Sequence, residues 1–125
     1  MTQEGLNNLS NQIIGVAIKV HKNLGPGFVE KVYERALLYE FKKEGIKFAT
    51  EVPIKIKYEN IDIGGQRIDI IVEDAIILEL KSMSAICDAH KAQLISYLKV
   101  TNKRLGLILN FARSKLEIKR IVNNF

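Results

Sequence analysis

The stretch RIDIIVEDAIILELK, from Arg67 to Lys81, constrains the fold of this chain more than any other. Two runs of aliphatic, mostly β-branched residues flank a short acidic segment, and this pattern predicts a β-hairpin. Asp69, Glu79 and Lys81 nevertheless interrupt strands whose composition favours burial. A carboxylate that is buried without a partner is costly, and its pKa shifts toward the neutral form. We therefore expect the hairpin to hold something that compensates these charges, namely a divalent metal ion and a phosphate.

The register of the two strands decides whether the charges meet. Side chains alternate across a strand, so one face of the hairpin should carry the charge and the wholly aliphatic face should meet the core. The charged face is expected to consist of Arg67, Asp69, Ile71, Ile77, Glu79 and Lys81. Asp69 lies opposite Glu79 only if the loop has three residues, 73–75, whereas a two-residue turn would place Asp69 opposite Leu78. The hydrophobic pattern favours the three-residue loop because the shorter turn mixes charge with core.

Two carboxylates that face each other destabilise a sheet. They also provide the oxygen ligands that Mg²⁺ prefers. Lys81, one pleat from Glu79, could orient a water molecule or stabilise charge on a phosphoryl oxygen. The D-x9-E-x-K pattern thus indicates metal-assisted hydrolysis. The alternative is an ion pair, Asp69–Lys81 or Glu79–Arg67, on a solvated face, since short E-x-K strings are common.

The rest of the chain alternates between helical and strand periodicity. Helices are expected over 6–22, 28–43 and 85–101, with the NLGPG turn separating the first two. Strands are expected over 51–58, in the hairpin, and at RLGLILNF and KLEIKRIV. The buried stripe of the second helix should contain Val29, Tyr33, Leu37 and Phe41, and Cys87 should be a buried helix residue. The order α-α-β-β-β-α-β-β predicts a mixed α/β (α+β) domain with helices packed on a central sheet.

Length and composition favour a single domain, 1–125, which buries its own core, because 47% of the residues are hydrophobic. The polar N-terminus and the absence of long apolar runs predict a cytoplasmic, soluble protein with no signal peptide and no membrane partner. One cysteine and two histidines argue against a disulfide, a zinc knuckle or a histidine-rich metal site. The net charge of +5 lets a nucleic acid approach easily. Lys55 and Lys57 point outward, either as a solvated edge, which we favour, or as contacts to a nucleic-acid backbone.

Four blocks along the chain resemble a known family. They are VHKNLGPGFVEKVYERAL, which contains Gly27-x-x-Glu30-x-x-Tyr33, then RIDIIVEDAIILELK, HKAQLISYLK and LGLILNF. In this order they closely resemble the GxxExxY family of the PD-(D/E)xK nuclease-like superfamily, over residues 13–123. The resemblance implies a restriction-endonuclease-like core of order αβββαβ with an extra N-terminal helix. It also implies Mg²⁺- or Mn²⁺-dependent hydrolysis of phosphodiester bonds in DNA or RNA. One position departs from the superfamily name, because Ile68 stands where the proline would be.

The resemblance also implies a set of site residues. The metal-binding acid and the E-x-K pair fall on Asp69, Glu79 and Lys81, the helix-borne acid falls on Glu30, and a Q-x-x-x-Y signature falls on Gln93 and Tyr97. Metal ligands would be Asp69, Glu79 and Glu30, with Lys81, Gln93 and Tyr97 completing the catalytic group. Tyr33, His21 and His90 are expected to support the site. From the residues alone, we favour a role of Glu30 in complementing the helix dipole, and His21 could cap the first helix.

The leading hypothesis is a metal-dependent nuclease. A nuclease-fold module without catalysis, which binds nucleic acid or a partner protein, is the alternative. A core of this size also suggests a homodimer or a protein partner that helps to grip the substrate. A purely structural domain with a salt-bridged acidic pair is the third and weakest hypothesis.

Overall fold

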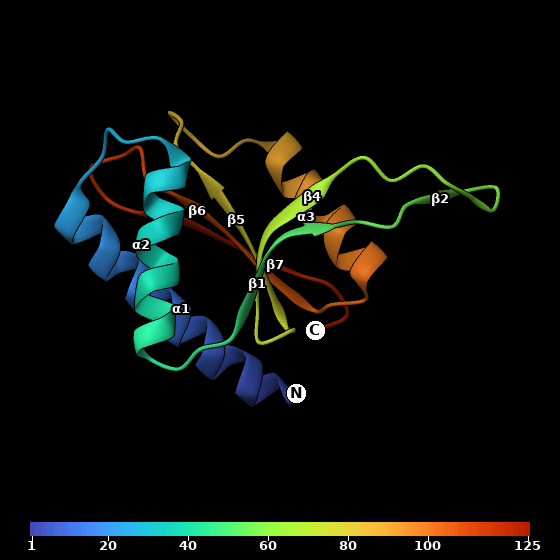
Figure 1. Cartoon of the computed structure of the whole chain (residues 1–125), viewed down its shortest axis with the longest axis horizontal. Coiled ribbons are helices and arrows are strands. Elements are labelled where there is room, and N and C mark those ends of the chain that lie inside the picture. Colours follow the sequence, from blue (N-terminus) through green and yellow to red (C-terminus); the bar gives the residue numbers. More distant parts are fainter.

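The computed structural model describes all residues, 1–125, as a mixed α/β fold. A five-stranded sheet of order β1-β4-β5-β6-β7 lies between two layers of helices, with α1 and α2 on one face and α3 on the other (Figure 1). The predicted order of elements is confirmed except between α2 and β4, where three strands, β1, β2 and β3, stand in place of the single predicted strand. Their bounds are α1 Gln3–Leu24, α2 Glu30–Lys43, β1 Phe48–Pro53, β2 Lys57–Tyr58, β3 Ile61–Asp62, β4 Arg67–Val72, β5 Ile76–Lys81, α3 Asp88–Thr101, β6 Leu105–Asn110 and β7 Glu117–Val122. No helix of the chain is both long and apolar enough to cross a membrane.

The central hairpin has the predicted register. Ile70 pairs with Leu78, and Val72 pairs with Ile76, which leaves residues 73–75 as a three-residue loop. Strand β5 then pairs in parallel with β6, and α3 makes the crossover between them. A parallel crossover places a helix against the sheet. It also brings Lys81 and Asn110, which are paired, to the same end of the sheet.

Both faces of the hairpin are buried, so the prediction of one charged face and one core face is wrong. Ile70, Val72 and Leu78 pack with α1 and α2 in one apolar cluster. Ile71 and Ile77, predicted on the charged face, pack with Leu94, Tyr97 and Leu98 of α3 in a second cluster. The physical reason is that α3 covers this second face, which leaves only the strand ends near solvent.

Side-chain alternation breaks at Asp69. Ile68 packs in the cluster under α3, although alternation would place it with Ile70 in the cluster under α1 and α2. In the pairing of β1 with β4, the residue pairs on both sides of this point are regular, but Asp69 has no partner. Glu51, which would face it, has a φ of 50°. This irregularity frees the Asp69 backbone from the β1–β4 ladder.

Three predictions about individual segments are corrected. The strand expected over 51–58 is two strands, β1 and β2, and the connection after it contains β3, so that β2 and β3 form a small projecting hairpin (Figure 1). Val29 precedes α2 and is 68% exposed rather than part of the buried stripe, while Tyr33, Leu37 and Phe41 are buried as predicted. Cys87 is exposed because α3 begins one residue later, so Cys87 is the N-cap residue rather than a residue packed under the helix.

Candidate active site

The candidate site lies at one end of the sheet. Strand β5 ends there at Lys81, strand β4 begins there at Arg67, and α2 begins there at Glu30 (Figure 1). Asp69 and Glu79 lie just inside this end, on neighbouring strands. The fold therefore brings together residues as far apart in the sequence as Glu30 and Lys81, which are separated by 51 positions.

The carboxylates of Asp69 and Glu79 are interlocked with the backbone between β4 and β5. The Asp69 N–H donates a hydrogen bond to Glu79 Oε2 at 3.0 Å, and the Leu80 N–H donates to Asp69 Oδ2 at 2.9 Å. The paired register of the hairpin ends at Ile70 and Leu78, so the two side chains take over the role of ladder carbonyls beyond it. Glu79 is only 5% exposed and Asp69 is half-buried. Two acidic groups thus share one narrow space.

Burial and mutual repulsion raise the pKa of both groups. Burial and then the neighbouring Asp69 charge raise the pKa of Glu79 to about 8. Burial likewise raises the pKa of Asp69, against the opposing effects of the Leu80 N–H and the Lys81 ammonium. The amide hydrogen bonds and Lys81 therefore compensate these carboxylates only in part. A divalent cation would supply the missing positive charge.

The structure does not contain the ion pair between a carboxylate and Lys81 or Arg67 that the sequence left open as the alternative. Neither Lys81 nor Arg67 forms a salt bridge with Asp69 or Glu79. The two carboxylates are also not on a solvated face, since α3 covers it. Lys81 is half-buried, and its charge acts on both carboxylates without closing an ion pair with either.

Helix α2 contributes two more carboxylates. Glu30 is its exposed first residue, and Glu34 is one turn further along, with only 8% of its surface exposed. Both charges raise the pKa of Asp69, so both lie within electrostatic range of it. Lys31 Nζ lies 3.3 Å from Glu34 Oε2 and 3.8 Å from Glu51 Oε1. Glu34 was not predicted from the sequence, although its spacing of four from Glu30 places both on one helix face.

Tyr33 fixes the turn from which Glu30 emerges. Its hydroxyl donates to the Gly25 carbonyl at 2.7 Å and accepts from the Phe28 N–H at 3.2 Å, and its ring stacks on Phe111 with centroids 4.4 Å apart. Ser82, directly after Lys81, donates to the Phe28 carbonyl at 3.0 Å. The turn is thereby joined both to its own helix and to the end of β5. Its tight path uses Gly25 and Gly27, whose φ values of 70° and 113° favour glycine.

Replacing Tyr33 by Phe should keep the ring stack and remove both hydroxyl hydrogen bonds. We expect the free energy of unfolding to fall by roughly 1–2 kcal/mol, since each lost bond contributes about 1 kcal/mol. Urea denaturation of wild type and Tyr33→Phe measures this, and Tyr39→Phe is the matched control because Tyr39 is 63% exposed. Equal stabilities of wild type and Tyr33→Phe would show that the hydroxyl does not hold the turn.

Gln93 and Tyr97 reach the site from α3. Tyr97 is buried, and burial raises its pKa, with further contributions from the charges of Glu79 and Asp69. The Gln93 side chain acts in the opposite direction by hydrogen bonding to the same hydroxyl. The hydroxyl also donates to Gln66 Oε1 at 3.0 Å, a residue that the sequence did not indicate. The one feature of the sequence that points to Gln66 is its position directly before the hairpin.

The two histidines have other partners. His21 is buried, and its Nε2 lies 2.9 Å from the Arg113 carbonyl, in the loop between β6 and β7. His90 Nδ1 accepts a hydrogen bond from the Cys87 N–H at 3.1 Å, which caps α3. Neither is among the groups that act on the pKa of Asp69 or Glu79. The structure therefore gives them contacts of their own rather than contacts to the carboxylate pair.

The oxygen donors of the site suit a hard cation. Carboxylates without thiolate or imidazole neighbours fit Mg²⁺ or Mn²⁺ better than Zn²⁺. As they stand, no three His, Cys, Asp or Glu side chains are grouped closely enough to hold a metal ion. One oxygen of each carboxylate is committed to a backbone N–H, which leaves Oδ1 of Asp69 and Oε1 of Glu79. A cation here would be completed by water, by substrate phosphate or by a carboxylate of α2.

Comparisons with known proteins agree with this architecture. Residues 7–121 match the model of the PD-(D/E)XK nuclease superfamily. Among solved structures, the crystal structure of SSO0001 is similar, with a TM-score of 0.58 and 20% sequence identity over 76% of this chain. The chain covers 50% of SSO0001, so it spans about half the length of that protein. This likeness confirms the predicted restriction-endonuclease-like fold. No curated protein matches the chain.

Proposed function

We propose, from the premise that this chain belongs to the PD-(D/E)XK nuclease superfamily, that it is a metal-dependent nuclease which hydrolyses phosphodiester bonds in DNA or RNA. The observation that carries the proposal is the interlocked pair of Asp69 and Glu79, two carboxyl groups that share one narrow space and form no ion pair with a basic side chain. We further propose that residues 1–125 act as one domain. The narrower resemblance to GxxExxY proteins stays a prediction.

Each residue of the site has a proposed role. Asp69 and Glu79 hold Mg²⁺ or Mn²⁺, with Glu30 or Glu34 of α2 as the third carboxylate. When bound, the cation polarises a phosphoryl oxygen and lowers the pKa of a water molecule. Lys81 orients the attacking water or stabilises the charge that develops on the phosphoryl oxygens. The side chains of Gln93, Tyr97 and Gln66 form one hydrogen-bonded group and position the scissile phosphate.

Calorimetric titration of Mg²⁺ and Mn²⁺ tests the proposal. We expect the wild type to bind the metal and Asp69→Asn to lose binding, since the amide removes the charge but preserves the shape. Glu4→Gln is the control, because Glu4 lies in the first turn of α1, and the N-terminal end of that helix lies at the opposite end of the molecule from the end of β5 (Figure 1). The titration is repeated with a short, non-hydrolysable DNA present, because phosphate oxygens often complete a Mg²⁺ shell. A wild type that binds neither metal in either titration, and cleaves no DNA or RNA, would refute the proposal.

A second candidate function is a nuclease-fold module that binds nucleic acid or a partner protein without cleaving. The observation that favours it is that no three potential ligands are grouped as the side chains stand. Nucleic-acid binding that is equally tight with metal and with EDTA, and that Asp69→Asn leaves unchanged, would support this candidate. Metal-dependent cleavage by the wild type would exclude it.

A further inference from the structure

Residues 55–65, which we call the arm, project from the body of the molecule. In Figure 1 the arm, with β2 and β3, extends beyond the sheet and α3. Glu59 and Asn60, with φ values of 49° and 71°, form its turn. The hydrogen bonds of the arm join its own residues, as in the bond from the Ile63 N–H to the Ile56 carbonyl, and the Ile54 N–H to Gln66 carbonyl bond closes its root. A free two-stranded hairpin is marginally stable in water, so an arm like this is expected to rest against a partner when it acts.

The two faces of the arm differ in chemistry. Tyr58 pairs with Ile61, so both side chains lie on one face, and Ile63 follows two residues later on the same face. These three side chains are 64%, 63% and 58% exposed. Lys57 pairs with Asp62 on the other face, which Lys55 shares by alternation. Neither lysine forms an ion pair.

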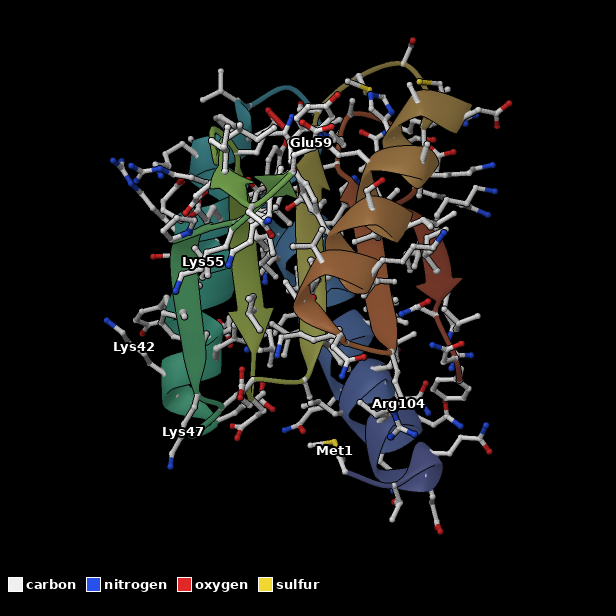
Figure 2. The ribbon with its side chains drawn as sticks, turned by 90° about the vertical axis from the view of Figure 1, so that its right-hand side faces the viewer. Met1, Lys42, Lys47, Lys55, Glu59 and Arg104 are labelled. Atoms are coloured by element: carbon white, nitrogen blue, oxygen red, sulfur yellow. The ribbon has the colours of Figure 1, made fainter.

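The root of the arm belongs to the candidate active site. Gln66, directly after the arm, accepts the hydrogen bond of the Tyr97 hydroxyl. Exposed Arg67 follows and also forms no ion pair, and Asp69 is two residues further on. Figure 2 shows Glu59, at the tip, toward one end of the molecule, with Lys42 and Lys47 toward the opposite end. Three basic residues without an ion pair, Lys55, Lys57 and Arg67, thus lie on the arm and at its root, although Asp62 faces Lys57 across the arm.

We propose that the arm grips duplex DNA by entering a groove beside the scissile phosphate. The inference rests on the proposed nuclease function and names its substrate class. Lys55 and Lys57 contact backbone phosphates, while Tyr58, Ile61 and Ile63 contact the base edges or the thymine methyl groups. A two-stranded ribbon fits the major groove of B-form DNA, about 12 Å wide. The major groove of A-form RNA is too narrow to admit it, which is why the proposal is for DNA.

Fluorescence anisotropy tests whether the arm contributes to DNA binding. The measurement is made in EDTA so that no nucleic acid is cleaved. The probes are one labelled 20-base-pair DNA duplex, the RNA duplex of the same sequence and the single DNA strand. The double variant Lys55→Gln, Lys57→Gln should bind the DNA duplex about tenfold more weakly. Its slope of log binding constant against log salt concentration should be shallower by the amount expected for roughly two lost phosphate contacts. Lys42→Gln with Lys47→Gln removes the same charge at the opposite end and should change the dissociation constant less than about twofold.

The apolar face is tested separately. Tyr58→Ser with Ile61→Thr should weaken DNA-duplex binding about tenfold without changing the salt slope, since it removes no charge. All four substituted arm residues are exposed, so the melting temperature should stay within a few degrees of the wild type. Sedimentation of the same variant shows whether this face instead holds a second copy of the chain.

The outcomes separate this inference from the proposed function. Arm variants that bind the DNA duplex like wild type would overturn the inference and leave the nuclease proposal standing. Equal losses on the RNA duplex or single strand would overturn the assignment to duplex DNA. A wild-type dimer that Tyr58→Ser with Ile61→Thr dissociates, without loss of DNA affinity, would assign the apolar face to a second copy. A wild type that binds no probe refutes the inference, whereas the metal titration and cleavage decide the proposed function.

Discussion

Glu79→Gln is expected to slow cleavage at least about a hundredfold and, at the same time, to stabilise the metal-free protein at alkaline pH. The folded protein holds a proton on Glu79, since burial and Asp69 raise its pKa from 4.5 to about 8. The unfolded chain releases that proton near pH 4.5. The stability of the wild type should therefore be greatest below this pH and decline as the pH rises, until the folded group is itself ionised above about 8. The decline should amount to roughly 3–5 kcal/mol, at 1.36 kcal/mol per pKa unit.

Glutamine removes this dependence. Its amide oxygen can still accept the hydrogen bond of the Asp69 N–H, and it carries no charge at any pH. The variant should therefore show a weaker decline, to which only Asp69 contributes, and should be the more stable protein at pH 9. Cleavage should fall at least about a hundredfold, because loss of groups that merely support metal ligands already costs 10–100-fold.

The measurement is urea denaturation in EDTA at pH 5, 7 and 9, together with cleavage in Mg²⁺. Glu4→Gln is again the control, because it removes the same charge from an exposed helix turn. A wild type that becomes more stable from pH 5 to pH 9 would contradict the raised pKa of Glu79. A Glu79→Gln protein that cleaves like the wild type would contradict the role of Glu79 as a metal ligand.

The register of the hairpin could be predicted because the hydrophobic pattern selects it. Only the three-residue loop at 73–75 keeps Asp69 from lying opposite Leu78, and the meeting of Asp69 with Glu79 follows from that loop. What failed was the assumption that one face would be open. Ile71 and Ile77 on the second face indicate its burial, but which element covers that face depends on where the crossover helix α3 packs. The break at Asp69, opposite Glu51, is likewise a property of β1 and β4 together.

The residues of the candidate site likewise divide into those that could be predicted from local sequence and those that could not. Asp69, Glu79 and Lys81 could be predicted from the hairpin itself, whereas Glu30, Gln93 and Tyr97 depended on the resemblance. Glu34 and Gln66 were missed because a buried glutamate in an amphipathic helix, and a glutamine before a strand, look like ordinary surface residues in sequence. The partner of His21 is 92 positions away, so its contact with the Arg113 carbonyl could not be predicted from local pattern.

Lys81→Met is expected to slow cleavage while leaving metal binding largely intact. The backbone of Lys81 is fixed independently of its side chain, because Lys81 pairs with Asn110 and its carbonyl accepts the Phe111 N–H at 3.0 Å. The ammonium forms no salt bridge, which leaves it available to water or phosphate. Methionine retains most of the aliphatic stem and removes the charge. A single donor aimed at developing negative charge contributes about 10²–10³ in kcat, and the loss should be of this order.

Single-turnover cleavage and metal titration together decide what Lys81 does. Lys81→Arg retains the charge but changes its geometry, and it should recover only part of the rate, since a planar guanidinium does not replace a compact ammonium. Lys42→Met is the control for removal of an exposed lysine without an ion pair. If Lys81→Met lost metal affinity as strongly as rate, Lys81 would act by lowering the pKa values of Asp69 and Glu79, which is the electrostatic effect the structure already shows. If the variant cleaved like the wild type, the E-x-K lysine would have no part in the chemistry, and the water would have to be oriented by the carboxylates alone.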